Sequence, residues 1–307
     1  MLPGRCDHHA MNTLDDSSRS QWQSRRGAVR HRPVMPILCE FDTQTVRASA
    51  NPQSDTRATV CFARRLVARP RLPHGIRMLD VDKNANIRVK STLPFTAAWA
   101  DCHMIAWDGT RLYKGVDDIF VLTPGDLDFL TGEHMRKTKD PSSVRVDFER
   151  RFVTPPKVVV FLNYIDLDKN RNWRLNVRAS GVDVSGFTLY VETWGDTILH
   201  AAQACWIAYP EDREYIFSTS VNTMDLQVGV AKSQPQQNNR DIVFDKVGFW
   251  KNPSVFVALN FLDVDCKANL RINAYVDGVS RTGLVCHIDS WDDTVLYAAG
   301  VSIIAFN

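Results

Sequence analysis

Three stretches of the chain repeat one pattern of acidic, apolar and basic residues. They are LDVDKNANIRVK (residues 79–90), IDLDKNRNWRLN (165–176) and LDVDCKANLRIN (262–273). Each is followed by an aromatic signature: AWDGTRLY (106–113), TWGDTILH (193–200) and SWDDTVLY (290–297). The tryptophan of each signature lies 19 or 20 residues after the arginine of the stretch before it. Spacing kept this closely indicates an internal repeat of one small domain.

The same register extends upstream of these stretches. A proline stands ten residues before the first aspartate of each copy, at Pro70, Pro156 and Pro253. Further upstream, phenylalanines recur at Phe41, Phe129 and Phe217. We therefore divide the chain into a tail, residues 1–36, which we expect to be disordered, and three repeats. The repeats are residues 37–122, which are the most degenerate, 123–210 and 211–307.

Within each repeat the sequence predicts strands rather than helices. A β-branched run, Val158–Val160, follows a Pro-Pro bend, and GFTLYVETW (186–194) alternates with a period of two. We find no helical stripe with apolar residues at i, i+3, i+4 and i+7 over ten or more residues. Short apolar runs separated by turn residues favour an all-β sandwich or barrel. The stretch AKSQPQQNNRD (231–241) predicts an exposed loop.

Composition narrows the functional classes. The 307 residues are 44% hydrophobic and 23% charged, which is ordinary for a globular protein. The net charge is +2, and the tail with six arginines and three aspartates contributes +3 of it. A near-neutral body argues against nucleic acid as a partner, because phosphate binding needs a concentrated basic face. No apolar run suits membrane insertion or a secretory signal, which favours a cytoplasmic location.

The sequence gives no sign of a metal site, cofactor or disulfide framework. Its seven cysteines form no CxxC pair, so we expect reduced, mostly buried thiols. The repeated D-x-D-x-N element resembles the start of a calcium loop, but the glycine and glutamate that such a loop requires are absent. The alternative is that these aspartates cap their own backbone in a turn between two strands.

The chain also carries no motif of an enzyme. GxSxG, HExxH and a glycine-rich phosphate loop are all absent. An active site normally occurs once in a domain, whereas every polar feature here occurs three times, which favours binding over catalysis. A glycoside hydrolase remains as an alternative, although no unique pair of carboxylates indicates one.

The repeated tryptophan and arginine have two interpretations each. The tryptophans could be core aromatics, or their ring faces could lie against a sugar, since a polar turn with acidic residues and a threonine follows each ring. The arginines could make charged hydrogen bonds to sugar hydroxyls, or they could form structural ion pairs with the aspartates that precede them in each repeat.

These residues together resemble a known family. The elements F-x-x-x-F-x-x-P-P-x-V-x-V (148–160), I-D-x-D-x-x-x-N-x-R (165–174) and G-F-x-x-x-V-x-T-W-x-D-T (186–197) are similar to the H-type lectin domain, the family of snail agglutinin and the discoidin C-terminal domain. The resemblance covers nearly all of residues 37–307 as three copies. It implies three six-stranded antiparallel β-sandwiches that bind N-acetylgalactosamine or galactose, without enzymatic activity.

The resemblance also implies site residues. The family's binding arginine falls on Arg88, Arg174 and Arg271, and its tryptophan on Trp107, Trp194 and Trp291. The next residue, often histidine in the snail lectin, is Asp108, Gly195 or Asp292. The family's tyrosine, contributed across a subunit boundary, is Tyr113, Tyr297 and, in the second copy, His200. An aspartate between the first two strands is matched by Asp55, Asp140 and Asp241.

Copy number suggests an arrangement. Since single-domain relatives assemble as trimers, three copies on one chain could close into an intramolecular pseudo-trimer with three non-identical sites. Short connections at 119–127 and 209–215 favour packed neighbours over beads on a string. The glycan partner then gains from several linked sites. A competing interpretation is a protein-interaction scaffold of the same fold whose sugar sites have decayed. Lectins similar to discoidin leave cells without a signal peptide, so release is a second possibility for location.

Overall fold

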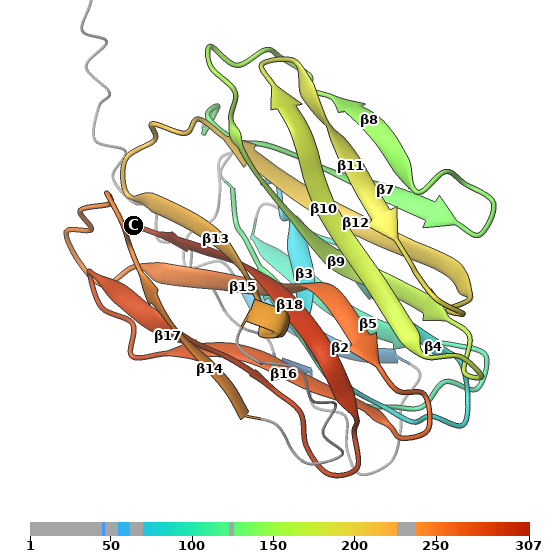
Figure 1. Cartoon of the computed structure of the whole chain (residues 1–307). Helices are drawn as coiled ribbons and strands as arrows, with labels where there is room; N and C mark the ends of the chain where they lie inside the picture. Colours follow the sequence, from blue (N-terminus) through green and yellow to red (C-terminus); the bar gives the residue numbers. More distant parts are fainter. Residues whose placement is uncertain (1–44, 47–54, 62–69, 97, 123–125, 226–236) are drawn as a thin grey trace, which may run out of the picture. The chain divides into compact units, whose positions relative to one another are not determined.

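The structure is a computed structural model that describes residues 45–46, 55–61, 70–96, 98–122, 126–225 and 237–307 (Figure 1). The predicted tail, residues 1–36, lies outside the described residues. Within the described residues the chain forms eighteen β-strands and a single 3-10 turn, Thr223–Asp225, which confirms the all-β prediction. Among these residues no helix has the length and apolar character needed to cross a membrane.

We call residues 37–122, 123–210 and 211–307 the first, second and third segments. The strands of the first segment are β1 (Thr45–Val46), β2 (Asp55–Cys61), β3 (His74–Val81), β4 (Ile87–Thr92), β5 (Trp99–Ala106) and β6 (Leu112–Ile119). Those of the second are β7 (Leu130–Lys137), β8 (Ser143–Asp147), β9 (Lys157–Leu167), β10 (Trp173–Asp183), β11 (Gly186–Glu192) and β12 (Leu199–Tyr209). Those of the third are β13 (Ile216–Asn222), β14 (Gln237–Val243), β15 (Ser254–Val264), β16 (Leu270–Asp277), β17 (Gly283–Asp289) and β18 (Leu296–Phe306).

Each segment thus supplies six strands, but the strands belong to two different sheets. The three antiparallel six-stranded sheets have the orders β2-β5-β4-β9-β12-β7, β13-β18-β15-β10-β11-β8 and β1-β6-β3-β16-β17-β14. Three strands of every sheet come from one segment and three from another. The sheets join first to second, second to third and third to first segment, so the sharing of strands closes into a ring.

Three strand pairs make these joins. We name them the first–second boundary (β4 with β9), the second–third boundary (β10 with β15) and the third–first boundary (β16 with β3). Without them, β4, β10 and β16 would each leave a row of unpaired backbone groups at a sheet edge. The sequence predicted sandwiches of six strands per repeat, and the structure shows in addition that each sheet is completed by a neighbour.

Strands β3, β9 and β15 contact one another in the interior. Five residues before the first repeated aspartate, these strands carry Gly75, Phe161 and Ala258. A Cβ atom on Gly75 would lie 2.5 Å from the Ala258 Cβ and 2.6 Å from the Phe161 Cδ2. No side chain fits at Gly75 because the large ring of Phe161 and the methyl group of Ala258 occupy the shared space.

Two further expectations can be compared with the fold. The described cysteines, Cys102, Cys205, Cys266 and Cys286, are free thiols, and three of them are buried as predicted. Burial raises the pKa of Cys286 to about 12, which keeps its thiol protonated. The predicted loop 231–241 is wrong in its second part, because residues from Gln237 onward form β14 against β17.

Candidate functional site

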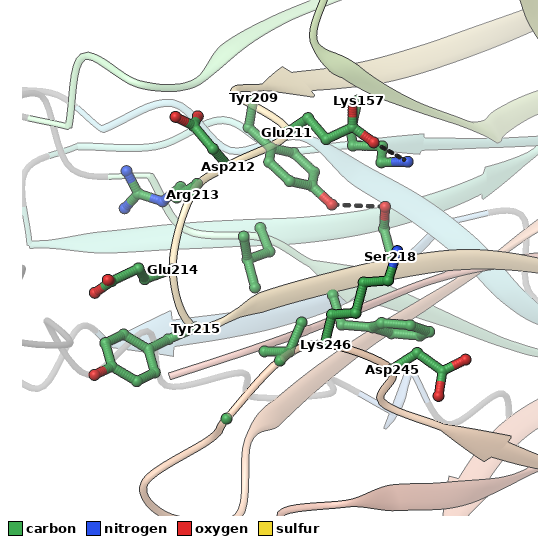
Figure 2. A pocket seen from close by; sticks show the side chains of 14 residues that line it. Lys157, Tyr209, Glu211, Asp212, Arg213, Glu214, Tyr215, Ser218, Asp245 and Lys246 are labelled. Atoms are coloured by element: carbon green, nitrogen blue, oxygen red, sulfur yellow. Dashed lines mark hydrogen bonds and ion pairs between the residues drawn. The ribbon is translucent and has the colours of Figure 1, made fainter.

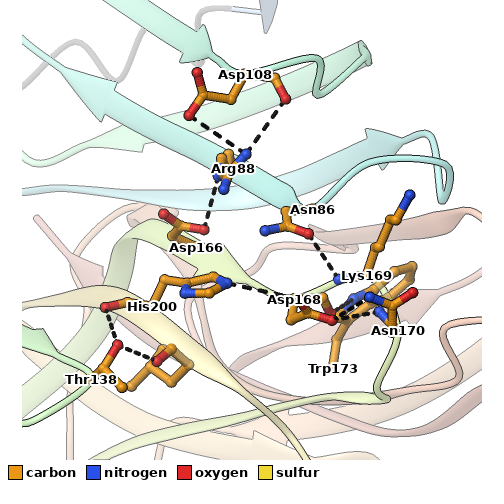
Figure 3. A network of polar contacts seen from close by, with 11 residues as sticks. Asn86, Arg88, Asp108, Thr138, Asp166, Asp168, Lys169, Asn170, Trp173 and His200 are labelled. Atoms are coloured by element: carbon orange, nitrogen blue, oxygen red, sulfur yellow. Dashed lines mark hydrogen bonds and ion pairs between the residues drawn. The ribbon is translucent and has the colours of Figure 1, made fainter.

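At the first–second boundary, the predicted binding arginine is held by carboxylates from two segments (Figure 3). Arg88 on β4 pairs in register with Asp166 on β9, and its Nε lies 3.2 Å from Asp166 Oδ1. Its Nη1 lies 3.6 Å from the carboxylate of Asp108, in the turn after Trp107. Burial raises the pKa of Asp166, and the positive charge of Arg88 opposes that rise.

The second segment also brings His200 to this boundary. Its Nε2 lies 3.9 Å from Asp168 Oδ2 (Figure 3). The Trp107 ring packs on Tyr164 of the second segment with centroids 5.3 Å apart. The predicted Arg88, Trp107, Asp108 and His200 therefore gather across one boundary.

The second–third boundary repeats this arrangement. Arg174 Nε lies 3.3 Å from Asp263 Oδ1 of the third segment, and its Nη1 donates to Asp196 at 2.7 Å. The Trp194 ring stacks on Phe261, with centroids 5.2 Å apart and planes 20° apart. Tyr297, at the position of His200, donates to Asp265 at 2.8 Å, and this bond raises the pKa of its hydroxyl.

The third–first boundary gathers the most carboxylates. Arg271 Nε lies 3.4 Å from Asp80 Oδ1, and its Nη2 lies 3.2 Å from Asp292 Oδ2. Its Nη1 is paired with Asp293. From the first segment, Tyr113 donates to Asp82 at 3.0 Å. One guanidinium therefore sits among three aspartates here, two of them exposed.

The turn after each tryptophan starts with a left-handed residue in all three copies, and in the first copy Gly109 is left-handed as well. Asp108, Gly195 and Asp292 adopt positive φ angles of 49°, 63° and 56°. At Gly195 a Cβ would lie 2.7 Å from Arg174 Nη1, so the arginine occupies the space that an aspartate fills in the other copies. The threonine that ends each turn donates to a backbone carbonyl, at 2.6 Å for Thr110 and Thr197 and 2.7 Å for Thr294.

The repeated D-x-D element forms a turn in which an aspartate caps its own backbone, as the sequence predicts. The second aspartate accepts the backbone N–H two residues on, at 2.7 Å for Asp82, 2.8 Å for Asp168 and 2.8 Å for Asp265. The repeated asparagine makes a hydrogen bond across each boundary. Its side-chain oxygen accepts a backbone N–H of the neighbouring segment at 3.1–3.2 Å, in the pairs Asn86 with Lys169, Asn172 with Cys266 and Asn269 with Lys83. This stretch of sequence therefore builds the joins between segments.

The structure decides between the two interpretations of the repeated arginines and of the repeated tryptophans. The arginines do form ion pairs, but with the first aspartate of the neighbouring segment rather than with the preceding aspartate of their own. The tryptophans are not core residues: Trp194 is 36% exposed, and Trp107 and Trp291 are partly exposed. A tryptophan face, a fixed guanidinium and exposed carboxylates at one place can stack on an apolar ring face and bond neighbouring hydroxyls.

The three aspartates predicted from the loop between the first two strands behave differently. Asp140 lies in the turn between β7 and β8, where it accepts the Lys137 N–H at 2.7 Å. Asp55 is the first residue of β2, and its side chain lies outside what the structure describes. Asp241 lies inside β14, opposite Val285, so its placement in a loop is wrong. Val285 pairs with Asp277, six residues or roughly 20 Å along β16 from Arg271.

The sequence analysis missed several members of these sites. Asp80, Asp166 and Asp263, which the sequence offers as turn caps or as partners of the arginine in their own repeat, bind the arginine of the neighbouring segment. Asp196 and Asp293 contact arginines as closely as any predicted residue. The recurrence of the first three aspartates in every copy was the available signal. Among the described residues, no group of three or more histidine, cysteine, aspartate or glutamate side chains is arranged to hold a metal ion.

Comparison with known proteins agrees with this picture in two of the three segments. Residues 143–209 and 239–306 match the H-type lectin domain. The Fuscovulum blasticum protein described as "ATP synthase subunits region ORF 7" is 33% identical over 89 residues, which are 28% of this chain and 77% of that protein. No solved structure matches the chain. The chain therefore carries two stretches of H-type lectin domain sequence, one in its second segment and one in its third.

Proposed function

We propose that the protein is a lectin that binds glycans ending in N-acetylgalactosamine or galactose at its three segment boundaries. The observation that carries this proposal is the repeated gathering of one arginine, a tryptophan turn and a tyrosine or histidine from the neighbouring segment. Ion pairs alone would need no aromatic ring or phenol at the same place. In each site the hydroxyls of one sugar can bond to the arginine and the exposed carboxylates, with the ring's C–H face on tryptophan.

The three sites differ in ways that predict different affinities. The third–first site has the exposed carboxylates of both Asp292 and Asp293 beside Arg271. The second–third site has Asp196 but Gly195 in place of the other acid. The first–second site uses His200, whose ring can donate or accept but is shorter than tyrosine. We expect all three to bind, with the two tyrosine sites holding the sugar more tightly.

We also propose that the chain works as a single-chain pseudo-trimer. Every sheet uses strands of two segments, and the three joins form a closed cycle. A second chain is then not needed to pair β4, β10 or β16. Light scattering during gel filtration is expected to give the mass of one chain, 34.8 kDa, and a stable assembly of three chains would contradict closure.

Titration calorimetry with N-acetylgalactosamine tests the lectin proposal. We expect saturable binding of up to three sugars per chain. Tyr297→Phe and Tyr113→Phe should each weaken one site, because the phenol is lost while the ring stays. Tyr275→Phe is the matched control, since its hydroxyl donates at 3.0 Å to Asp289 of its own segment. Unchanged binding in both site variants would remove these residues from the site.

A second candidate function is a protein-interaction scaffold with the same fold. It is favoured by one observation, that Arg88, Arg174 and Arg271 are each already paired with two or three carboxylates. Arg174→Ala separates the two functions, with Arg145→Ala as its control because Arg145 on β8 pairs with Asp183 of its own segment and does not line the groove. Loss of one sugar per folded chain in the first variant alone supports the lectin. Absence of sugar binding in the native chain supports the scaffold.

A further inference from the structure

The three interior strands bulge at the same place. The registers of β3 with β6, β9 with β12 and β15 with β18 each shift at two places, and one of the two skips an equivalent residue, which is Arg77, Asn163 or Asn260. Each lies three residues before the first repeated aspartate. A bulge turns its side chain away from the regular alternation of the strand. Here we compare the space that this side chain meets at each segment boundary. The same structural position therefore carries one cation and two amides.

At the third–first boundary this space is filled by the arginine. Arg77 Nε lies 3.1 Å from Asp118 Oδ1, and its Nη1 donates to the Ala274 carbonyl at 3.3 Å. Asp118 also accepts the Val257 N–H at 2.9 Å. Asp118 is 11 residues after Trp107, a position that Cys205 and Ser302 hold in the other segments.

At the first–second boundary a histidine fills the space. His74 is wholly buried, with Nδ1 at 3.1 Å from the Leu72 carbonyl, and its Nε2 lies 3.5 Å from Asn163 Nδ2. The residues at the corresponding position of the other two segments, six before the first aspartate, are Val160 and Val257. Burial lowers the pKa of His74, so it stands there as a neutral imidazole.

At the second–third boundary the corresponding residues are small and neutral. Asn260 Nδ2 donates to Ser220 at 2.8 Å and to Ser302 at 2.9 Å, and Ser302 donates to the Val160 carbonyl at 2.7 Å. Beside them lies a groove of about 350 Å³, a volume at the lower end of small-molecule sites. Residues 157–160, 176–179, 218–220 and 260–261 line it, together with Asn222 and Ser302.

The groove begins next to the proposed sugar site of this boundary. Asn176, which lines it, is two residues after Arg174 and therefore on the same face of β10, about 7 Å away along the strand. Asn176 pairs in register with Phe261, the ring on which Trp194 stacks. A sugar held at Arg174 and Trp194 would thus have the groove directly beside it.

A second hollow shares two lining residues with the groove. Lys157 and Ser218 line both the groove and a cavity of about 550 Å³, which Tyr209, residues 211–217 and the loop 245–248 also line (Figure 2). In that cavity Tyr209 donates to Ser218 at 2.6 Å.

The charges along the groove are paired within the protein. Arg178 makes two hydrogen bonds to Glu192, at 3.0 and 3.1 Å, and Lys157 lies 2.9 Å from Glu211. The remaining polar lining consists of amides and hydroxyls. Such groups suit the hydroxyls of a neutral sugar, whereas an anionic sugar would have to compete with Glu192 and Glu211 for their partners.

We propose that this groove is a subsite for the inner sugars of a neutral oligosaccharide whose terminal residue occupies the Arg174–Trp194 site. The inference rests on the proposed lectin function and extends it to one boundary. The second–third site reads two or more linked sugars, while Arg77 and His74 confine the other two sites to the terminal sugar.

The first test fills the groove with the two side chains that occupy the equivalent space at the third–first boundary. The double variant Asn260→Arg/Ser302→Asp reproduces the Arg77–Asp118 pair. Titration would use N-acetylgalactosamine and a panel of neutral di- and trisaccharides that end in it through α1-3, β1-3 and β1-4 linkages. In the native chain we expect one oligosaccharide to bind one site about tenfold more tightly than the monosaccharide, because a second sugar adds two or more hydrogen bonds. The double variant should lose that gain.

A second variant guards against misfolding of the first. Ser220 is exposed on β13, so Ser220→Trp fills the groove from its outer side. His134→Trp is the control, because it places the same ring on β7, the strand of the second segment that corresponds to β13. Ser220→Trp should abolish the oligosaccharide gain and leave N-acetylgalactosamine binding unchanged, whereas His134→Trp should keep both.

The outcomes separate the subsite from the lectin function. Monosaccharide binding without any oligosaccharide gain in the native chain would overturn the subsite alone. A gain that persists in both groove variants would also overturn it, as would a gain confined to sialylated chains. No binding of any sugar would overturn the proposed function itself.

Discussion

The boundary sites and the interior around β3, β9 and β15 use the same threefold repeat in opposite ways. At the boundaries the three copies carry nearly the same residues: an arginine, two aspartates of the D-x-D element, an asparagine and a tryptophan turn. In the interior, equivalent positions differ as much as Gly75, Phe161 and Ala258. The boundary residues perform one task three times, whereas the interior residues meet each other and must be complementary in size and charge.

This difference explains why the three segments are not interchangeable. Three phenylalanines at the position of Phe161 would overlap, and three glycines would leave a void, and both conditions destabilise a core. The bulge positions show the same rule for charge, since Arg77 is matched by Asp118 while Asn260 is matched by Ser302. Complementary divergence of this kind is open to copies on one chain but not to three identical subunits.

The largest effect is expected from breaking the interior. Phe161→Ala should lower the free energy of unfolding by about 4 kcal/mol, because it removes a wholly buried ring and leaves a cavity where Gly75 and Ala258 cannot fill in. Urea denaturation measures this loss. Val153→Ala is the control, since Val153 is 99% exposed and should cost almost nothing. A loss below 1 kcal/mol for Phe161→Ala would show that the interior is not packed around this ring.

The buried charge in the interior predicts a pH effect of about 3 kcal/mol. Burial raises the pKa of Asp118 to about 6, although Arg77 opposes the rise. Between pH 4 and pH 6 the unfolded chain has lost this proton while the folded chain still holds it, so stability falls as pH rises through that window. Asp118→Asn removes the titration but keeps an acceptor for the Val257 N–H.

The measurement is the difference in unfolding free energy between the native chain and Asp118→Asn at several pH values. It should change by about 3 kcal/mol between pH 4 and pH 6 and stay level above that range. The neighbouring Asp117 is also buried with a raised pKa, to which the charge of Asp118 contributes, so the same difference is also measured in an Asp117→Asn background. A difference that is flat with pH would show that Asp118 is ionised in the fold at pH 4.

A substitution at a boundary should lower the free energy of unfolding less than a substitution in the interior. Arg271→Ala leaves the carboxylate of Asp80, whose Oδ1 is buried, without its cation and should cost about 2 kcal/mol. Arg178→Ala, which removes an ion pair whose arginine is 44% exposed, should cost less than 1 kcal/mol. Urea midpoints compare the two. Equal costs would mean that the join between segments does not depend on the Arg–Asp pair.

The comparison also shows what the sequence could reveal. Residues that recur at fixed spacing, such as Arg88 and Trp107, were recognised because repetition marks a shared role, and strands such as β11 were recognised from their period of two. The pairing of Arg88 with Asp166 could not be derived, because it depends on which segment lies beside which. The groove could not be predicted for the opposite reason. Asn260 and Ser302 leave space for it because the equivalent residues of the other segments are different, and a position that differs between copies gives no repeat signal in the sequence.

The smallest predicted effect is also the one that tests the uniformity of the boundaries most directly. Thr110, Thr197 and Thr294 each donate to a backbone carbonyl at 2.6–2.7 Å, so replacing any one with valine removes one hydrogen bond at nearly constant shape. Each variant should lose about 1 kcal/mol of unfolding free energy, and replacement with serine should retain most of it. Three equal losses, measured by urea denaturation, are expected if the boundary turns are one structure used three times. A loss at Thr197 that differs by more than 1 kcal/mol from the other two would show that Gly195 has changed its turn, and the contrast with the interior would then be one of degree.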